Sequence, residues 1–195
     1  MIPKNITINP DRIFNTDDPN EIIMDVIETP LMEKFAEIVT RNGGDILEIG
    51  FGMGISANYI YNSQILNYTC IEIHPEIYER ALEWAKDKPN VKIILGDWFD
   101  IIPRLTDKFD GIFMDTFEFS NYRNFEDYCK TIAKDGCILS IFDYSTQNNR
   151  SLEHETIELA GKVDYFRSNT NVFKLYYTYF DGDMFGRKTK PNKLL

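Results

Sequence analysis

The chain has 195 residues, of which 43% are apolar, so it can build one sizeable core and is too apolar to be intrinsically disordered. Its 21 basic and 31 acidic side chains leave a net charge of −10, which disfavours nucleic acid as a partner. No apolar run reaches the roughly 18 to 20 residues of a membrane span, and residues 1–12 lack the apolar stretch of a signal peptide. We expect a soluble, cytoplasmic protein with no membrane partner.

The three cysteines, Cys70, Cys129 and Cys137, lie far apart in the chain among apolar residues. Their odd number and their spacing fit neither a disulfide framework nor a zinc site, so we expect reduced thiols in the core. The two histidines, His74 and His154, lie in polar helix or turn contexts without partners at ligand spacing. We expect both at the surface, with no catalytic role and no metal site.

The first predicted elements are two helices. Asp18 is suited to the N-cap of a helix that runs through residue 27. Because Pro30 cannot lie inside a continuing helix without strain, a break is expected near Glu28. A second helix, over 29–41, then begins with Pro30 in its first turn, and Glu28 projects from the junction.

The middle of the chain alternates between two patterns. Short, mostly apolar segments bounded by Gly, Asn, Asp or Pro predict strands at 45–50, 66–73, 91–95, 109–115 and 136–142. Apolar residues at helical spacing predict helices at 57–61, 77–85 and 122–132. This alternation is typical of a doubly wound α/β fold with a parallel sheet covered on both faces.

After the fifth strand, residues 147–160 have helical potential, and 162–168 and 171–180 predict a strand followed by a returning antiparallel strand. The result is a mostly parallel seven-stranded sheet with an antiparallel edge strand. No linker divides the chain, so 1–195 is predicted to be a single domain. It comprises N-terminal cap helices (1–41), a cofactor-binding core (42–180) and a basic tail (181–195).

A glycine-rich segment, 48–54, closes the first strand and opens a helix, which is where open α/β sheets bind ligands. Glycines there let the backbone approach a ligand closely, although a tight turn without a ligand needs them equally. The dinucleotide pattern G-x-G-x-x-G requires a third glycine where this chain has Ile55. A dehydrogenase-like site is therefore disfavoured.

Polar and aromatic side chains follow the next two strands. Glu72 ends the second strand, where its carboxylate can accept hydrogen bonds from ribose hydroxyls, or can be an ordinary exposed acid. Asp97 and Trp98 follow the third strand, where Trp98 can stack on a purine while Asp97 pairs with its exocyclic amine. Trp98 fits a core position nearly as well.

Together, E-I-G-F-G-M-G (48–54), Glu72, G-D-W (96–98) and M-D (114–115) resemble the S-adenosylmethionine site of class I methyltransferases, over roughly residues 19–180. The resemblance implies that Gly50 and Gly52 face the methionine part of the cofactor, Glu72 the ribose, and Asp97 with Trp98 the adenine. The other residues that it places at the cofactor are Glu48, Met53, Gly54, Ile73, Gly96 and Asp115. The product would be S-adenosylhomocysteine.

Four stretches resemble, more specifically, guanidinoacetate methyltransferase and its relatives that methylate arginine. They are Glu28-Thr29-Pro30 with Met32, Gly50-Phe51-Gly52-Met53, the run from Gly96 through FDG to MDTF, and the acidic strand end CIE. This resemblance implies that Glu28 and Asp115 are the catalytic and substrate-binding carboxylates. Beside them, Thr116, Phe117 and Ser145 would contact the substrate.

The chemistry of a guanidinium supports two carboxylates independently. The group is planar and carries five N–H donors when singly substituted, so two acids can bind its edges. Its pKa lies above about 12 and its lone pairs are delocalised, so it is a poor nucleophile. Asp115 would draw on one N–H and take the proton, while Glu28 holds the opposite edge. Taken singly, Asp115 is better explained as a turn cap and Glu28 as an ordinary exposed helix-end acid, and it is their E-T-P and M-D-T contexts together with the cofactor loop that favour the functional interpretation.

The chain departs from the family at its substrate end. Where an N-L-T-S-like run of donors is expected, residues 142–146 read F-D-Y-S-T, and Asp143 would oppose a substrate carboxylate. The acidic N-terminal segment suits a cation. The acceptor therefore stays open between a guanidinoacetate-like molecule and free or peptide arginine. An oxygen or amine acceptor, and a nucleoside-binding module without transfer chemistry, are the alternatives, and a homodimer is possible.

Overall fold

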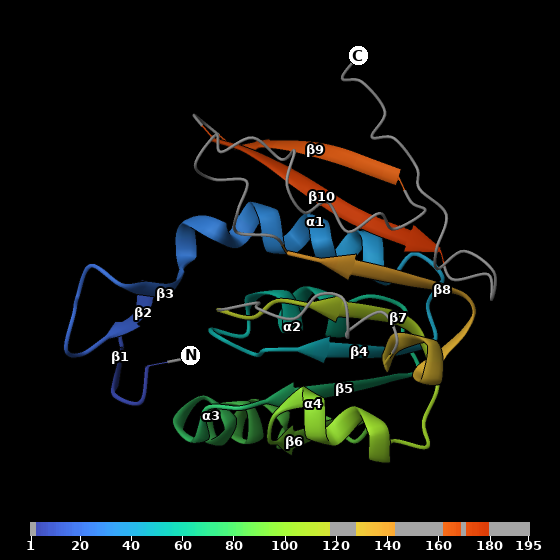
Figure 1. Cartoon of the computed structure of the whole chain (residues 1–195), viewed down its shortest axis with the longest axis horizontal. Helices are drawn as coiled ribbons and strands as arrows, with labels where there is room; N and C mark the ends of the chain where they lie inside the picture. The colour runs from blue at the N-terminus through green and yellow to red at the C-terminus, as the bar shows by residue number, and fades with distance from the viewer. Residues whose placement is uncertain (1–2, 118–127, 143–161, 169–170, 180–195) are drawn as a thin grey trace.

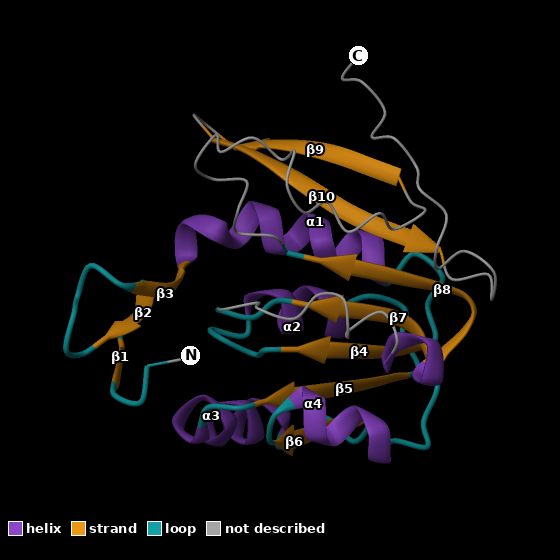
Figure 2. Cartoon of the chain, in the orientation of Figure 1, coloured by secondary structure: helices purple, strands orange, loops and turns teal. Residues whose placement is uncertain are grey.

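The computed structural model describes residues 3–117, 128–142, 162–168 and 171–179. Its N-terminal part comprises β1 (Ile6–Ile8), β2 (Arg12–Asn15), β3 (Ile22–Asp25), η1 (Val26–Glu28) and α1 (Thr29–Val39). The remaining elements are β4 (Asp45–Ile49), α2 (Ile55–Tyr61), β5 (Asn67–Glu72), α3 (Pro75–Ala85), β6 (Val91–Leu95), α4 (Trp98–Ile101), η2 (Ile102–Arg104), β7 (Phe109–Met114), β8 (Ala133–Ile141), β9 (Lys162–Ser168) and β10 (Asn171–Tyr179). Residues 128–132 are helical. Figures 1 and 2 show this arrangement.

The main sheet has the strand order β6-β5-β4-β7-β8-β10-β9, and its first five strands are parallel. All five were predicted from the apolar segments, and β6 has the predicted bounds. The observed order places β4 in the middle, so the chain winds first toward β6 and then back toward β8. The doubly wound α/β fold is confirmed.

The last two strands complete the sheet in an order that differs in detail from the prediction. β10 pairs antiparallel with both β8 and β9, so β9 forms the edge and the antiparallel strand lies one position inside it. Because β10 follows β9 after two residues, it pairs with β9 as a hairpin and uses its other side to pair with β8. The predicted helix over 147–160 and the tail over 181–195 lie outside the described residues.

Side chains of β4 point alternately to the two faces of the sheet, and each face carries its own hydrophobic core cluster. Ile46 packs with α1, α2 and α3 on one face of the sheet, whereas Leu47 and Ile49 pack on the other face with η2 and the helical residues 128–132. Cys70 belongs to the first cluster, and Cys129 and Cys137 belong to the second. All three cysteines are buried as free thiols, as predicted.

The predicted first helix, over 18–27, is wrong, because residues 18–21 form a turn, 22–25 form the strand β3 of a three-stranded antiparallel sheet, and 26–27 begin the single turn η1. Asp18 begins a β-turn in which the Glu21 N–H donates to the Asp18 carbonyl at 2.9 Å, with Pro19 at the second position. Asp followed by Pro is as typical of such a turn as of a helix start. The second helix is confirmed as α1, with Glu28 at its N-cap.

The small sheet β1–β3 lies beside the carboxyl ends of the parallel strands (Figure 1). Ile6, Ile13 and Met24 anchor it, since their buried side chains belong to the same core cluster as α1 and α2. The N-terminal region therefore covers the edge of the sheet at which the sequence predicts the functional site. No helix in the described ranges is both long and apolar enough to cross a membrane.

Candidate active site at the carboxyl edge of the sheet

Main-chain hydrogen bonds continue the parallel ladder past the last strand residues. The Gly50 N–H donates to Ile71 O, the Asp115 N–H to Ile49 O, and the Gly96 N–H to Glu72 O, each at 2.9 Å. These bonds place the ends of β6, β5, β4 and β7 in one row. The glycine loop, Glu72, Gly96 and Asp115, which were predicted from separate motifs, thus lie along one edge.

Gly50 shows why this junction requires glycine. Its φ is +90°, a left-handed conformation that side chains rarely adopt. A Cβ at this position would also overlap the carbonyl oxygen of Asp115. The segment after β4 can therefore approach the segment after β7 only because Gly50 has no side chain. This close approach brings Asp115 beside the loop.

Glu72 is only 3% exposed and ties the loop to the end of β5. Its Oε2 accepts a hydrogen bond from the Phe51 N–H at 2.8 Å, and its Oε1 accepts one from the His74 N–H at 2.7 Å. Each carboxylate oxygen has a second lone pair, so two ribose hydroxyls can still be bound. The ribose role of Glu72 stays a prediction with a compatible geometry.

Glu48 lies fully buried beneath the loop. Its carboxylate accepts hydrogen bonds from the hydroxyls of Ser56 and Tyr68. Burial raises the pKa of Glu48 to about 7; the two hydroxyl hydrogen bonds oppose this shift, and the charge of Glu72 adds to it. Its position supports the loop from below, and a direct cofactor contact stays a prediction.

Met24 of β3 is a loop neighbour that sequence reasoning missed. The Met53 N–H points to its Sδ at 3.1 Å, and a Cβ on Gly52 would overlap the same sulfur atom. Burial alternates along β3, with Met24 buried and Ile23 less so, as is typical of a strand. The sequence pattern predicts a helix here and therefore does not single out Met24. Gly54 also has a positive φ, of 73°, and lies against the Phe51 ring.

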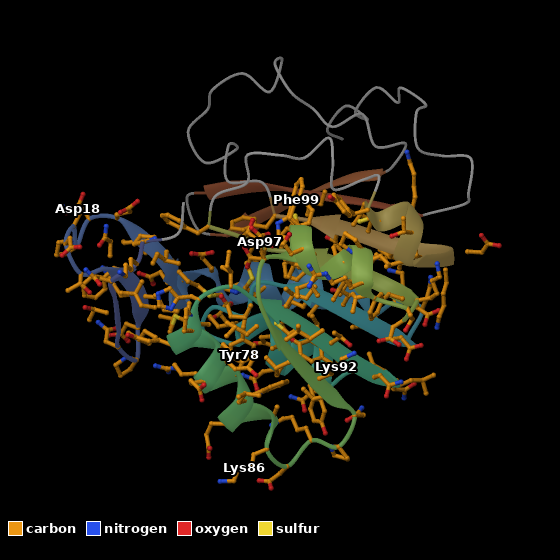
Figure 3. All side chains as sticks on the ribbon, turned by 60° about the horizontal axis from the view of Figure 1, so that its bottom comes forward. Asp18, Tyr78, Lys86, Lys92, Asp97 and Phe99 are labelled. Atoms are coloured by element: carbon orange, nitrogen blue, oxygen red, sulfur yellow. The ribbon has the colours of Figure 1, made fainter. Side chains whose placement is uncertain are left out.

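The predicted adenine end lies beyond β6, where Figure 3 labels Asp97 and Phe99 close together. Asp97 is the N-cap of α4, and its Oδ1 accepts from the Phe99 N–H at 3.0 Å. Trp98 is partly buried, with its ring centroid 4.9 Å from that of Phe99 and 5.6 Å from that of Tyr128. Trp98 therefore packs against the second core cluster, and only part of its surface remains for a ligand. Ile73, which directly follows the last residue of β5, is 47% exposed.

Glu28 lies at the junction of η1 and α1, as predicted, and it is only 7% exposed, so it is not the ordinary exposed helix-end acid of the alternative interpretation. Its Oε1 accepts a hydrogen bond from the Asp25 N–H at 3.2 Å. Burial raises the pKa of Glu28 to about 8, and the charge of Asp115 adds to this shift. The two predicted substrate carboxylates thus lie close enough to interact, although 86 residues separate them in the chain.

Asp115 shares this environment. Burial raises its pKa to about 7, and the charges of Glu48 and Glu72 add to the shift. No basic side chain contributes to the shifts of Glu28, Glu48 or Asp115. This part of the described structure is therefore short of positive charge, and a cationic ligand would be stabilised there.

The remaining predicted residues have mixed outcomes. Thr116 and Phe117 follow Asp115 and are partly exposed, whereas Ser145 lies outside the described residues. The prediction that His74 is at the surface is wrong, since it is 5% exposed, with its Nε2 3.4 Å from Lys4 O. Its Nδ1 has no partner among the described residues. In the same part of the chain, no group of His, Cys, Asp and Glu is arranged to hold a metal ion.

Solved structures share this fold. An O-methyltransferase from Bacillus cereus in complex with SAH has a TM-score of 0.61 at 14% identity, over 77% of this chain and 80% of that one. The spermidine synthase of Thermotoga maritima has a TM-score of 0.63 at 12% identity, over 96% and 79%. With the sheet order and the glycine loop after its central strand, these similarities establish the Rossmann-like fold of class I S-adenosylmethionine-dependent methyltransferases.

Residues 16–142 match the guanidinoacetate N-methyltransferase family, and the chain belongs to that family. Among its relatives is protein arginine N-methyltransferase 2 of Aspergillus fumigatus, 30% identical over 180 residues, which are 88% of this chain and 42% of that protein. The protein of the same name from Saccharomyces cerevisiae is 32% identical over 166 residues, 79% of this chain and 40% of that protein. The chain thus spans less than half the length of these relatives.

Proposed function

We propose that the protein is an S-adenosylmethionine-dependent N-methyltransferase whose methyl acceptor is a guanidino nitrogen. The observation that carries this proposal is the approach of two mostly buried carboxyl groups, Glu28 and Asp115, beside the glycine loop. Family membership and the names of the arginine-methylating relatives support the same reaction. When bound, S-adenosylmethionine supplies a methyl group activated by its positively charged sulfur.

The residues at the strand ends fit this cofactor. The glycine loop lets the main chain approach a ligand, and Glu72 keeps lone pairs for the ribose. Exposed Ile73 provides an apolar surface next to Glu72, where a base can pack. The carboxyl groups of Glu48, Glu72 and Asp115 make the surroundings negative as they ionise, and that charge stabilises a cationic cofactor more than a neutral product.

Glu28 and Asp115 would bind the guanidinium from two sides. Each carboxylate accepts charge-assisted hydrogen bonds from the planar group, which fixes its orientation as well as its position. The positive charge of the substrate also compensates two carboxylates that, without it, hold protons up to near neutral pH. Holding the acceptor in one orientation in a water-poor site supplies much of the rate.

Asp115 would also receive the proton. It accepts a hydrogen bond from one N–H, which localises electron density on that nitrogen. As the nitrogen–carbon bond forms and the carbon–sulfur bond breaks, the proton moves to Asp115. A carboxyl group with a pKa of about 7 then releases it to water near neutral pH.

The negative site favours an acceptor without a carboxylate near its guanidine. An arginine side chain within a peptide meets this requirement better than guanidinoacetate, whose carboxylate lies one carbon from the guanidino nitrogen. Asp143 would add to this discrimination if it faces the substrate, and it lies outside the described residues. A cytoplasmic location and a homodimer stay predictions from the sequence.

Incubation with isotopically labelled cofactor and a panel of acceptors tests the proposal. The panel contains guanidinoacetate, arginine, agmatine, an arginine-containing peptide and the same peptide with lysine as the matched control, and products are read by mass spectrometry. We expect one added methyl mass on a guanidino acceptor and none on the lysine peptide. Methylation of an amine or oxygen acceptor, with none on any guanidine, would replace the proposal with the alternative reaction.

A further inference from the structure

The Glu28 carboxylate is oriented by the strand that precedes it. The Asp25 N–H donates to Glu28 Oε1 at 3.2 Å, while the Ile27 N–H donates to Asp25 Oδ1 at 3.0 Å. The two side chains form a capping box around the single turn η1. The position of the Glu28 carboxylate therefore depends on Asp25.

Asp25 is held in turn by the neighbouring strand. Arg12 Nη2 lies 3.2 Å from Asp25 Oδ2, and the two residues are opposite each other in the pairing of β2 with β3. The Val26 N–H continues this pairing with a bond of 2.8 Å to Asp11 O. The Asp25 side chain is 17% exposed and that of Arg12 is 43% exposed, so the pair is partly shielded from solvent.

We propose that Arg12 and Asp25 are positioning residues, which hold the Glu28 carboxylate in place for the acceptor through the chain Arg12–Asp25–Glu28. The inference rests on the proposed function, because Glu28 is the residue that would touch the acceptor. It extends the site into the N-terminal sheet and gives that sheet a role in substrate binding.

The charges around Glu28 make this role measurable. The charge of Asp115 and that of Asp25 both raise the pKa of Glu28, whereas the hydrogen bond from the Asp25 main chain lowers it. Arg12 offsets the charge of Asp25. Removing the Arg12 charge should therefore make Glu28 harder to ionise, and removing the Asp25 charge should make it easier. A purely structural pair would not give opposite effects.

The test compares pH profiles of kcat/KM for the methylated acceptor in Arg12→Gln, Asp25→Asn and Arg12→Lys. In Arg12→Gln we expect the acidic limb of the kcat/KM profile to move to higher pH by about half a unit, which lowers kcat/KM about threefold at a fixed pH on that limb. In Asp25→Asn the limb should move to lower pH by a similar amount. Arg12→Lys should restore most of the wild-type profile, since it keeps the charge. KM for the acceptor should change more than kcat.

Lys92→Gln is the matched control. It removes a surface ion pair of similar length, 3.3 Å, between Asp107 and Lys92 of β6, an edge strand of the main sheet. Figure 3 shows Lys92 well away from Asp18, which marks the N-terminal sheet. This variant should keep the wild-type profile.

Two results separate this inference from the proposed function. If Arg12→Gln and Asp25→Asn fold with near-normal melting temperatures and keep the wild-type profile, the positioning role is wrong. If Glu28→Gln itself keeps a normal KM, the proposed role of Glu28 fails first. Should Arg12→Gln not fold, Asp25→Asn carries the test alone, because asparagine retains the oxygen that accepts from the Ile27 N–H.

Discussion

Glu28 is a buried carboxyl group, and the charge of a second carboxyl group, Asp115, adds to burial in opposing its ionisation. With a pKa of about 8 for Glu28 and about 7 for Asp115, both groups hold protons over part of the neutral range. Ionising them without a cation nearby costs free energy, so the ionised, ligand-free protein has a lower free energy of unfolding. A bound cation would compensate this cost.

The free energy of unfolding of the ligand-free protein should therefore depend on whether Glu28 is protonated. The folded pKa of Glu28, about 8, lies above its ordinary value of 4.5, so the folded state binds the proton more tightly than the unfolded state. The stabilisation is complete below about pH 4.5 and is lost as pH rises through 8. Glu28→Gln keeps the acceptor for the Asp25 N–H and cannot ionise. We expect it to raise the free energy of unfolding by about 1 to 3 kcal/mol at pH 8.5.

Thermal denaturation at pH 5.5 and pH 8.5 checks this. Each kcal/mol corresponds to roughly 2 to 4 °C in melting temperature for a chain of this size. The gain should appear at the higher pH and shrink at the lower one. An equal loss of stability at both pH values would contradict the assignment of a strained, ionisable Glu28.

Asp115→Asn separates chemistry from cofactor binding. Asparagine preserves the shape but cannot take the proton, so turnover with the true acceptor should fall by at least about 100-fold. Calorimetry should find binding of S-adenosylhomocysteine within about threefold of wild type. Glu72→Ala is the converse variant, because it frees the Phe51 and His74 N–H groups and should weaken that binding by about tenfold or more. Near-normal turnover in Asp115→Asn would exclude it as the proton acceptor.

The five parallel strands illustrate what short-range pattern predicts well. Each is an apolar run between turn residues, and their alternation with helices is sufficient for the doubly wound topology. The N-terminal sheet was mispredicted, because Asp18 and Pro19 start a turn as readily as a helix and residues 22–27 suit either periodicity. The strand that forms there buries Met24 against the glycine loop, a contact that local pattern does not contain.

The close contact between Gly50, in the loop after β4, and Asp115 can be tested by substitution. Gly50→Ala would force a Cβ into the Asp115 carbonyl oxygen, and backbone on both sides must move. Gly136→Ala is the control, because Gly136 also has a positive φ, of 77°, but a Cβ there meets nothing within 4 Å. In urea denaturation we expect a cost of about 1 kcal/mol for Gly136→Ala and of about 3 kcal/mol or more for Gly50→Ala. Equal costs would show that the contact with Asp115 is unimportant.

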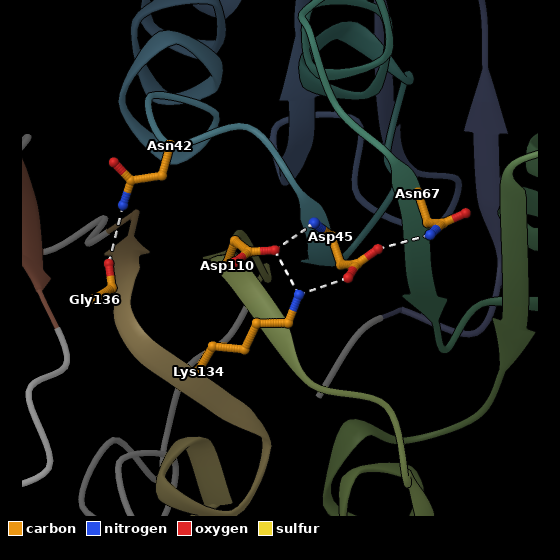
Figure 4. A network of polar contacts seen from close by, with 6 residues as sticks. All are labelled: Asn42, Asp45, Asn67, Asp110, Lys134 and Gly136. Carbon is orange, nitrogen blue, oxygen red and sulfur yellow. Dashed lines mark hydrogen bonds and ion pairs between the residues drawn. The ribbon is translucent and has the colours of Figure 1, made fainter.

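The opposite, amino-terminal edge of the sheet is tied by a polar network (Figure 4). Lys134 Nζ lies 2.7 Å from both Asp45 Oδ2 and Asp110 Oδ2, and Asn67 donates to Asp45 Oδ1 at 2.7 Å. The first residues of β4, β5, β7 and β8 are linked in this way. Asp110, part of the FDG segment, therefore has a structural role far from the site.

Lys134→Met tests that role. Partial burial opposes ionisation of Asp45, but the hydrogen bonds from Lys134 and Asn67 lower its pKa below the ordinary 3.8. The stabilisation is thus present above that value and is lost as pH falls through the folded pKa. We expect a loss of about 1 kcal/mol at pH 7 that shrinks as pH falls below the ordinary value of 3.8, with unchanged kcat/KM. Lost activity in a stably folded variant would contradict a purely structural network.

The whole molecule brings together residues that are far apart in the chain. The N-terminal sheet contributes Met24 to the loop and Arg12 and Asp25 to Glu28, while the parallel sheet contributes Glu72 and Asp115. Motif spacing identified Glu28, Glu72 and Asp115 because each stands in a distinctive local sequence. Sequence patterns do not specify the tertiary contacts that bring these residues together. The same holds for the burial of Glu28 and for the contacts that link Arg12 through Asp25 to Glu28.

Binding of a guanidino acceptor to the enzyme saturated with S-adenosylhomocysteine tests the central claim most directly. Calorimetry at pH 8.5 would compare wild type, Glu28→Gln, Asp115→Asn and the double variant. If both carboxylates hold one guanidinium, each single change should weaken binding about tenfold or more, and the double variant should lose less than the sum of the two. Unchanged affinity in all three variants would contradict the claim that Glu28 and Asp115 together bind the acceptor.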